Sequence, residues 1–174
     1  APVRVALRRL VLDTVGVGLF GREQPWTQAV RAWAGAAVPA PGARGARLWG
    51  EADTRLRPAD AALVNGTAAH AYELDDFHNA KLHPGAVVVP AALALGDALG
   101  ADGARVETAI AAGYEVAIRT SLALDPSRAR LRGWHLTAVC GPLGAAAAAA
   151  VLLGLDEERT AWALGLAGTQ SGGL

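Results

Sequence analysis

The longest apolar run in this sequence restricts its possible folds more than any other feature. It extends from Ala138 to Leu155 and contains only apolar residues, glycine and proline. The run is just long enough to span a bilayer, but most of it is alanine and glycine, which contribute little to membrane insertion. Asp156, Glu157 and Glu158 follow at once, and no basic anchor lies nearby. We therefore expect a buried core helix and no membrane span.

The rest of the chain has the same helical character. Hydrophobic residues make up 52% of the sequence but aromatic residues only 5%, so small and aliphatic side chains dominate and favour closely packed helices. Asn65-Gly66, normally a turn signal, is interpreted as a small-residue patch where two helices cross. Apolar periodicity and Gly/Pro punctuation predict about seven helices, at residues 3–21, 25–37, 59–72, 84–100, 103–124, 136–155 and 157–168.

The predicted connections contain at most one short strand. Residues 39–42 form a Pro/Gly linker, residues 46–50 a short extended segment, residues 53–58 a turn and residues 128–132 an arginine-rich loop. A length of 174 residues suits one domain with a real core. We therefore expect an all-α, multi-helix domain over residues 1–174.

Charge and cysteine content narrow the partners and the compartment. The 16 basic and 16 acidic residues balance and form no basic stripe, which argues against nucleic acid as the main partner. The single Cys140 excludes an internal disulfide and indicates a reducing compartment. No stretch has the pattern of a signal peptide. These features predict a cytoplasmic protein.

The segment from His70 to Gly85 concentrates the titratable groups of the chain. It holds three of the four histidines, three carboxylates and the only lysine, namely His70, Glu73, Asp75, Asp76, His78, Lys81 and His83. A packed helical protein does not need so many ionisable groups in one short segment. They are therefore candidates for proton-transfer chemistry.

Two histidines are expected at the start of helices. His83 precedes Pro84-Gly85, and His135 stands before the most apolar helix. Helix N-termini attract carboxylates and phosphates and lower the pKa of a histidine. Neutral histidines at such positions suit a general base acting on an acidic substrate. Thr137 is either a donor to a substrate carboxylate or a simple helix cap.

The carboxylates of this segment act against the helix starts on the histidine pKa values, and they are also candidate metal ligands. Glu73, Asp75 and Asp76 favour the charged form of nearby histidines, and the sequence does not decide which effect dominates. Together with His78 and His83 they could bind a metal, but their spacing matches neither zinc sites nor the calcium loop, so none is expected.

Several of these motifs occur in an order that resembles a known family. They are Asn65-Gly66-Thr67, His70 to Asp76, His83-Pro84-Gly85, Gly113-Tyr114-Glu115-Val116, Gly133-Trp134-His135-Leu136-Thr137 and Leu152-Leu153-Gly154-Leu155. Their order and spacing resemble the MmgE/PrpD family, which includes 2-methylcitrate dehydratase, cis-aconitate decarboxylase and iminodisuccinate epimerase.

The resemblance implies both a fold and a chemistry. It implies a helical domain that usually also mediates dimerisation, followed by a smaller α+β lid domain, with the active site between them. The chemistry implied is cofactor-free and metal-free acid–base work on di- or tricarboxylates. By motif, the catalytic residues are the Glu73, Asp75 and Asp76 group, His83 and His135. This agrees with the two histidines expected at helix starts.

Substrate contacts are expected around the same segment. The candidates are Phe77, His78, Lys81 and Thr137, with Lys81 interpreted as a solvated loop residue in preference to a catalytic amine. Phe77 stands where the family commonly has threonine, so a hydroxyl facing the substrate is missing. Leu136 replaces a common proline.

Three functions remain open at this point. The chain ends at Leu174, before the active-site lysine and lid of the family. It can be the helical half of a lyase that dehydrates or decarboxylates a carboxylic acid, completed by a second chain or a missing region. It can also be a non-catalytic partner or scaffold subunit. A third possibility is a repurposed biosynthetic cyclase or dehydratase acting on a larger apolar acid, which Phe77 would suit. In all cases we expect exposed apolar surface and a homodimer or other assembly.

Overall fold

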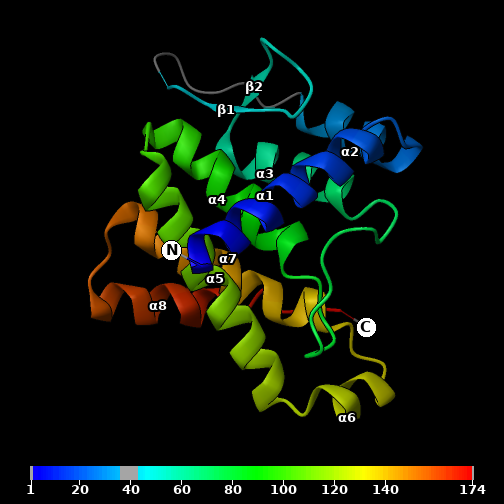
Figure 1. The fold of residues 1–174 in the computed structure, drawn as a ribbon, viewed down its shortest axis with the longest axis vertical. Coiled ribbons are helices and arrows are strands. Elements are labelled where there is room, and N and C mark those ends of the chain that lie inside the picture. Colours follow the sequence, from blue (N-terminus) through cyan, green and yellow to red (C-terminus); the bar gives the residue numbers. More distant parts are fainter. Residues whose placement is uncertain (1, 36–42, 174) are drawn as a thin grey trace.

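The computed structural model describes residues 2–35 and 43–173. These residues form eight helices and one two-stranded antiparallel sheet (Figure 1). The elements are α1 (Pro2–Gly21), α2 (Pro25–Ala34), β1 (Ala46–Arg47), β2 (Arg55–Leu56), α3 (Pro58–Ala69), α4 (Gly85–Leu99), α5 (Gly103–Ala123), α6 (Pro126–Leu131), α7 (Leu136–Leu153) and α8 (Glu157–Gly168). The all-α expectation is confirmed, and the described residues contain no α+β unit.

Helix α7, built from the long apolar run, lies at the centre of the fold (Figure 1). It packs against α4, α5 and α8. Gly113 of α5 and Gly144 of α7 meet where these helices cross, and a Cβ added to either would lie 2.8 Å from the carbonyl oxygen of the other. Glycine at both positions therefore permits the close approach. Helix α7 is long and apolar enough to cross a membrane by length and composition alone, yet 50% of it is buried within the fold.

The Asn65-Gly66 pair lies inside α3, as the helical interpretation predicted. A Cβ on Gly66 would lie 2.9 Å from the carbonyl oxygen of Ala86, so this glycine forms the crossing of α3 with α4. The Asn65 side chain accepts a hydrogen bond from the Trp49 amide and donates one to the Arg47 carbonyl. Asn65 thereby holds the strand segment against α3.

Two predicted connections are wrong. The expected arginine-rich loop at 128–132 is mostly helix α6, because Asp125 caps it through the Arg128 amide and Pro126 suits the first helical turn. The expected turn at 53–58 contains β2, which pairs Arg55 with Arg47 of β1. Helix α3 also ends at Ala69, before the predicted end at Tyr72. The linker predicted at 39–42 lies outside the described residues.

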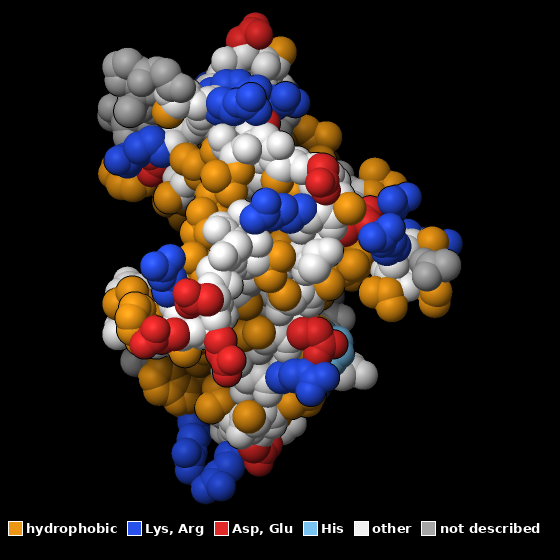
Figure 2. Space-filling model, turned by 90° about the vertical axis from the view of Figure 1, so that its left-hand side faces the viewer, with side chains coloured by type: hydrophobic (Ala, Val, Ile, Leu, Met, Phe, Trp, Pro, Cys, Tyr) orange, Lys and Arg blue, Asp and Glu red, His pale blue; other side chains and the backbone are white. Residues whose placement is uncertain are grey.

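Apolar side chains cover much of the surface. On the face drawn in Figure 2 they lie among the scattered charged groups and are not hidden beneath them. Trp33 is 65% exposed, and Trp26, Trp134 and Trp162 are exposed as well. Helix α8 buries none of its residues, all of which the structure describes. The predicted exposure of apolar surface is therefore confirmed.

Candidate active site

The segment rich in titratable groups forms the connection from α3 to α4, which descends beside the start of α7 (Figure 1). Glu73 and Lys81 adopt the left-handed backbone conformation, with φ of 51° and 64°, and turn the chain. The His78 amide donates to the Leu82 carbonyl at 3.0 Å. The Ser121 hydroxyl of α5 donates to the Ala80 carbonyl at 2.6 Å. The loop is therefore anchored at its turn and to a neighbouring helix.

Both predicted helix-start histidines lie where the sequence places them. His135 is the residue that precedes α7, and His83 lies two residues before α4. The His83 amide donates to Oγ1 of Thr137 at 2.9 Å, which ties the start of α4 to the first turn of α7. Thr137 is buried. Because its hydroxyl accepts the His83 amide, it has a structural partner besides any substrate contact.

Asp75 organises two of the histidines. Its side chain is fully buried, and Oδ1 lies 2.9 Å from Nδ1 of His70. Its Oδ2 lies 3.5 Å from Nδ1 of His83, and neither atom has a hydrogen-bond partner within residues 2–35 and 43–173. One buried carboxylate thus faces two imidazoles, and it forms a hydrogen bond with that of His70.

The three histidine rings form a compact group. The centroid of the His70 ring lies 5.0 Å from that of His83 and 6.2 Å from that of His135. Glu73 is exposed, and its carboxylate, a His70 nitrogen and a His135 nitrogen lie within 4.8 Å of one another. We call His70, His83 and His135 the histidine cluster. His70 is not among the catalytic residues that the family motifs imply, but it lies at the centre of this cluster.

The pKa values of two members of the histidine cluster are shifted in opposite directions. The hydrogen bond to Asp75 raises the pKa of His70 and outweighs the opposing effect of burial. Partial desolvation by the surrounding protein lowers the pKa of His135, and the charge of His70 acts in the same direction. His70 therefore keeps its proton to higher pH than His135 does. The two rings therefore differ in how readily they hold a proton.

Asp76 belongs to a second, buried polar group behind the loop. Its Oδ1 accepts the Gly85 amide at 2.8 Å at the start of α4. Burial raises the pKa of Asp76, and the nearby Tyr114 hydroxyl opposes the shift. Burial and Asp76 together raise the pKa of Tyr114. The Thr14 hydroxyl also lies against Gly85. Sequence reasoning did not assign Tyr114 or Thr14 to the site, although Tyr114 belongs to a quoted motif.

The remaining predicted residues lie around the histidine cluster. The Phe77 ring is 53% exposed and stands edge-on to His83 at 5.3 Å between centroids. His78 is exposed, and its Nδ1 accepts the Ala80 amide. Lys81 is partly buried at the turn. Their contacts with a substrate stay predictions.

Two sets of side chains at the histidine cluster have atoms close enough to hold a cation, and one of them is the Glu73, His70 and His135 set described above. Ligand atoms of His70, Asp75 and His83 lie within 4.8 Å of one another. The separation of 2.9 Å between His70 and Asp75 is that of a direct hydrogen bond. A shared proton accounts for this geometry.

An apolar groove of about 430 Å³ opens beside the cluster. Its walls come from α3, α4 and α7, and His70, His135 and Thr137 also line it. Most of the other lining side chains are small or aliphatic, namely Ala62, Leu63, Ala86, Val87, Pro90, Ala91, Ala138 and Ala145. Sequence reasoning did not find this groove, because its walls come from three separate helices.

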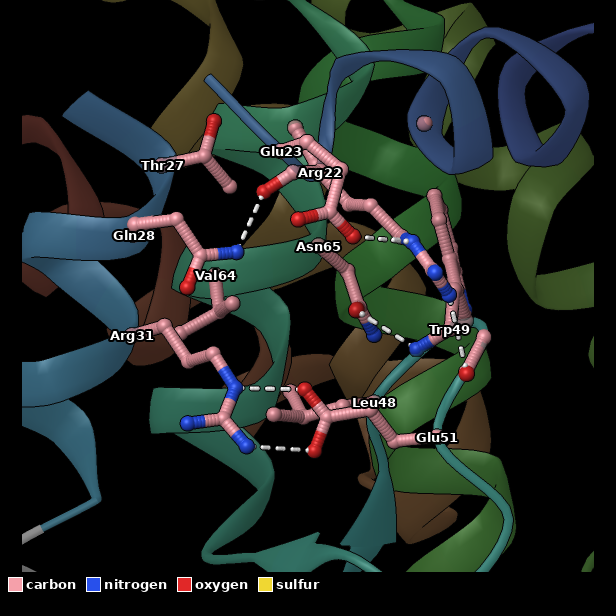
Figure 3. Close-up of a pocket in the computed structure, with 13 residues that line it drawn as sticks. Arg22, Glu23, Thr27, Gln28, Arg31, Leu48, Trp49, Glu51, Val64 and Asn65 are labelled. Carbon is pink, nitrogen blue, oxygen red and sulfur yellow. Dashed lines mark hydrogen bonds and ion pairs between the residues drawn. The ribbon is translucent and has the colours of Figure 1, made fainter. Parts of the chain in front are cut away.

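A second cavity of about 260 Å³ lies between α2, α3 and the strand segment (Figure 3). There the Arg31 guanidinium binds both carboxylate oxygens of Glu51, and the Gln28 amide donates to the Arg22 carbonyl (Figure 3). The charged groups are paired with each other, and the described residues that line the cavity include no histidine or cysteine. We regard it as a structural cavity.

Comparison with known proteins assigns the chain to a family. The family model for the MmgE/PrpD N-terminal domain matches residues 1–174. The cis-aconitate decarboxylase-like protein oryM of Aspergillus oryzae is 34% identical over 100% of this chain and 37% of its own length. Cis-aconitate decarboxylases of Aspergillus terreus and Homo sapiens are 34% and 31% identical, each over 95% of this chain and 34% of their own length. The chain therefore spans about a third of these curated relatives. It belongs to the MmgE/PrpD family, whose N-terminal domain it matches from its first residue to its last.

Proposed function

We propose that the chain forms the helical part of the active site of a lyase that decarboxylates a carboxylic acid by acid–base chemistry, without a cofactor. The observation that carries this proposal is the histidine cluster, in which the buried Asp75 forms a hydrogen bond with His70 and faces His83. The relatives described as cis-aconitate decarboxylases support the lyase class.

The histidine cluster suits an anionic substrate. His70, with its raised pKa, supplies positive charge for a carboxylate. The starts of α4 and α7 lie beside it and favour anions as well. Because Nδ1 of His83 faces Asp75, its Nε2 is the nitrogen left to exchange a proton with a substrate.

Beyond substrate binding, decarboxylation requires only that a proton is delivered to the carbon that loses CO₂. The bond between the leaving carboxylate and its neighbouring carbon breaks, and the electron pair stays on that carbon as CO₂ departs. A protonated histidine then gives its proton to the carbon. We assign this donation to His83. His135, whose lowered pKa suits a neutral base, then takes a proton from solvent and passes it back to His83, which restores the starting state.

Other groups would complete the site. Because the chain spans about a third of the relatives named above, we propose that a further segment or a second chain covers the histidine cluster and that the protein forms a dimer. The exposed apolar side chains support an assembly. The single buried Cys140 supports a cytoplasmic location.

The test is to incubate the enzyme that carries this chain with a panel of unsaturated di- and tricarboxylic acids. CO₂ release and product mass are measured with and without a metal chelator. We expect CO₂ release that the chelator does not change. Loss of water without CO₂ would replace decarboxylation by dehydration, which the same acid–base groups could perform. No reaction with any acid would contradict the proposal.

A further inference from the structure

We propose that the apolar groove beside the histidine cluster holds an alkyl chain of the substrate, so that the enzyme acts on an alkyl-substituted carboxylic acid. This inference rests on the proposed function, because it takes the histidine cluster as the site of the substrate carboxylates. The groove is continuous with that site, since His70 and His135 line both.

Polar atoms in the groove wall already have partners. The Thr67 hydroxyl donates to the Leu63 carbonyl of its own helix at 2.8 Å. Oγ1 of Thr137 accepts the His83 amide. Among the described residues that line the groove, the only other polar side chains are those of His70 and His135, at the histidine cluster. A polar ligand group in the body of the groove would therefore lose its hydration without gaining a partner.

Small residues leave room for a chain in the groove. Gly66 and Ala86 meet where α3 crosses α4, and Ala138 and Ala145 supply the wall from α7. A volume of about 430 Å³ lies within the range of small-molecule sites, which are mostly apolar with a few convergent polar groups. The histidine cluster supplies these polar groups at one end.

The residue beside His83 fits the same kind of substrate. Phe77 presents an aromatic ring that is 53% exposed next to the His83 imidazole. It offers apolar contact and no hydrogen bond at this point. A substrate that carries only carboxylates and hydroxyls would leave both Phe77 and the groove unused. An acid with an alkyl substituent uses the polar and the apolar parts together.

Binding and turnover should be measured separately in the enzyme that carries this chain. Calorimetry with saturated alkylsuccinic acids, which serve as non-reacting probes, gives affinity as a function of alkyl length. We expect affinity to rise about threefold to fourfold per methylene until the groove is full. CO₂ release from the matching unsaturated acids gives kcat/KM along the same series.

Two variants and one control test whether the dependence of affinity on alkyl length arises in the groove. Ala145→Leu narrows the groove and should remove the gain with chain length, while succinic acid binds as before. Leu63→Ser, at a position that is 47% exposed and safe for folding, should reduce the gain per methylene. Ala104→Leu, at an exposed position of α5 that does not line the groove, is the matched control and should leave the series unchanged.

The outcomes separate this inference from the proposed function. Affinity that stays flat with chain length overturns the inference, even if small acids are decarboxylated. A loss of assembly in Ala145→Leu, together with flat affinity, would mean that protein and not substrate fills the groove. Affinity that rises with chain length supports the inference, even if no acid releases CO₂, and in that case it is the proposed lyase activity that fails.

Discussion

Asp75 is the residue on which the geometry of the site depends most, because one buried carboxylate faces both His70 and His83. Replacing it with asparagine keeps the shape and removes the charge. We expect the pKa of His70 to fall towards its ordinary value of about 6.5, since the hydrogen bond to Asp75 is the largest cause of its shift. Histidine titration by NMR measures this. An unchanged His70 titration in Asp75→Asn would contradict the assignment.

The pair of Asp75 and His70 also makes the stability of the fold depend on pH. A group whose pKa is raised on folding stabilises the protein fully below its unfolded value, and this contribution is lost as pH rises through the folded value. For His70 the contribution is therefore present below about pH 6.5 and lost above its raised pKa. Asp75→Asn should lower the free energy of unfolding more at pH 5.5 than at pH 8.5. Denaturant unfolding at the two pH values measures the difference.

His135 is the strongest candidate for the base, and its replacement tests that role. His135→Asn should reduce kcat/KM about 10²–10⁴-fold, the usual contribution of general acid–base catalysis. Because its pKa is lowered, the acid limb of the wild-type pH profile should fall below pH 6.5. Steady-state kinetics across pH measures both effects. Activity within about threefold of wild type would remove His135 from the mechanism.

At the scale of elements, the crossing of α5 and α7 should tolerate no added methyl group. A Cβ at Gly144 would lie 2.8 Å from the Gly113 carbonyl oxygen and 2.9 Å from the Ala117 Cβ. Gly144→Ala should therefore cost about 1–3 kcal/mol. Gly165→Ala in α8 is the matched control, because its added Cβ meets no described atom within 4 Å outside the neighbouring residues of its own helix.

The two glycine variants should differ in sign. Alanine is favoured over glycine inside a helix by about 0.5–1 kcal/mol, so Gly165→Ala should be slightly stabilising. Urea unfolding of both variants gives the comparison. If Gly144→Ala proves as stable as Gly165→Ala, the α5–α7 contact is looser than described.

The helices were predictable where long apolar runs and Gly/Pro punctuation agree. Pro84 and the apolar run after His135 mark the starts of α4 and α7, so both histidines could be placed at helix starts. Helix α6 was missed, because its short arginine-rich sequence has no apolar periodicity and depends on the cap by Asp125. Strand β2 was missed because two residues carry no alternating pattern.

The site was only partly predictable for a related reason. The sequence indicated which side chains can transfer protons. The pairing of Asp75 with both His70 and His83, however, depends on the turn of the chain at Glu73. Glu73 has no glycine-like signal that would predict its positive φ.

At the scale of the whole molecule, the exposed apolar surface predicts self-association of the chain. Trp162 and Leu166, four residues apart on α8, are 60% and 71% exposed and lie on the same side of that helix. The chain by itself should form dimers or larger species at micromolar concentration. Light scattering measures this, and a clean monomer would contradict the prediction.

A double variant identifies the surface responsible. Trp162→Glu with Leu166→Glu should shift the chain towards the monomer without lowering its unfolding temperature, because neither residue is buried. Leu131→Glu, at an 89% exposed position on α6, is the control for a single added charge elsewhere. Equal effects of the two changes would mean that general repulsion, and not α8, governs association.

The bond between the His83 amide and the Thr137 hydroxyl links the loop that connects α3 to α4 with helix α7, which is 50% buried. The starts of α4 and α7 therefore cannot separate by fraying of one helix alone. Solvent exchange of the His83 amide hydrogen should be as slow as that of core amides, which open only in global unfolding. On warming, loss of activity and loss of the fold should then coincide at one temperature, with no inactive but folded state between them.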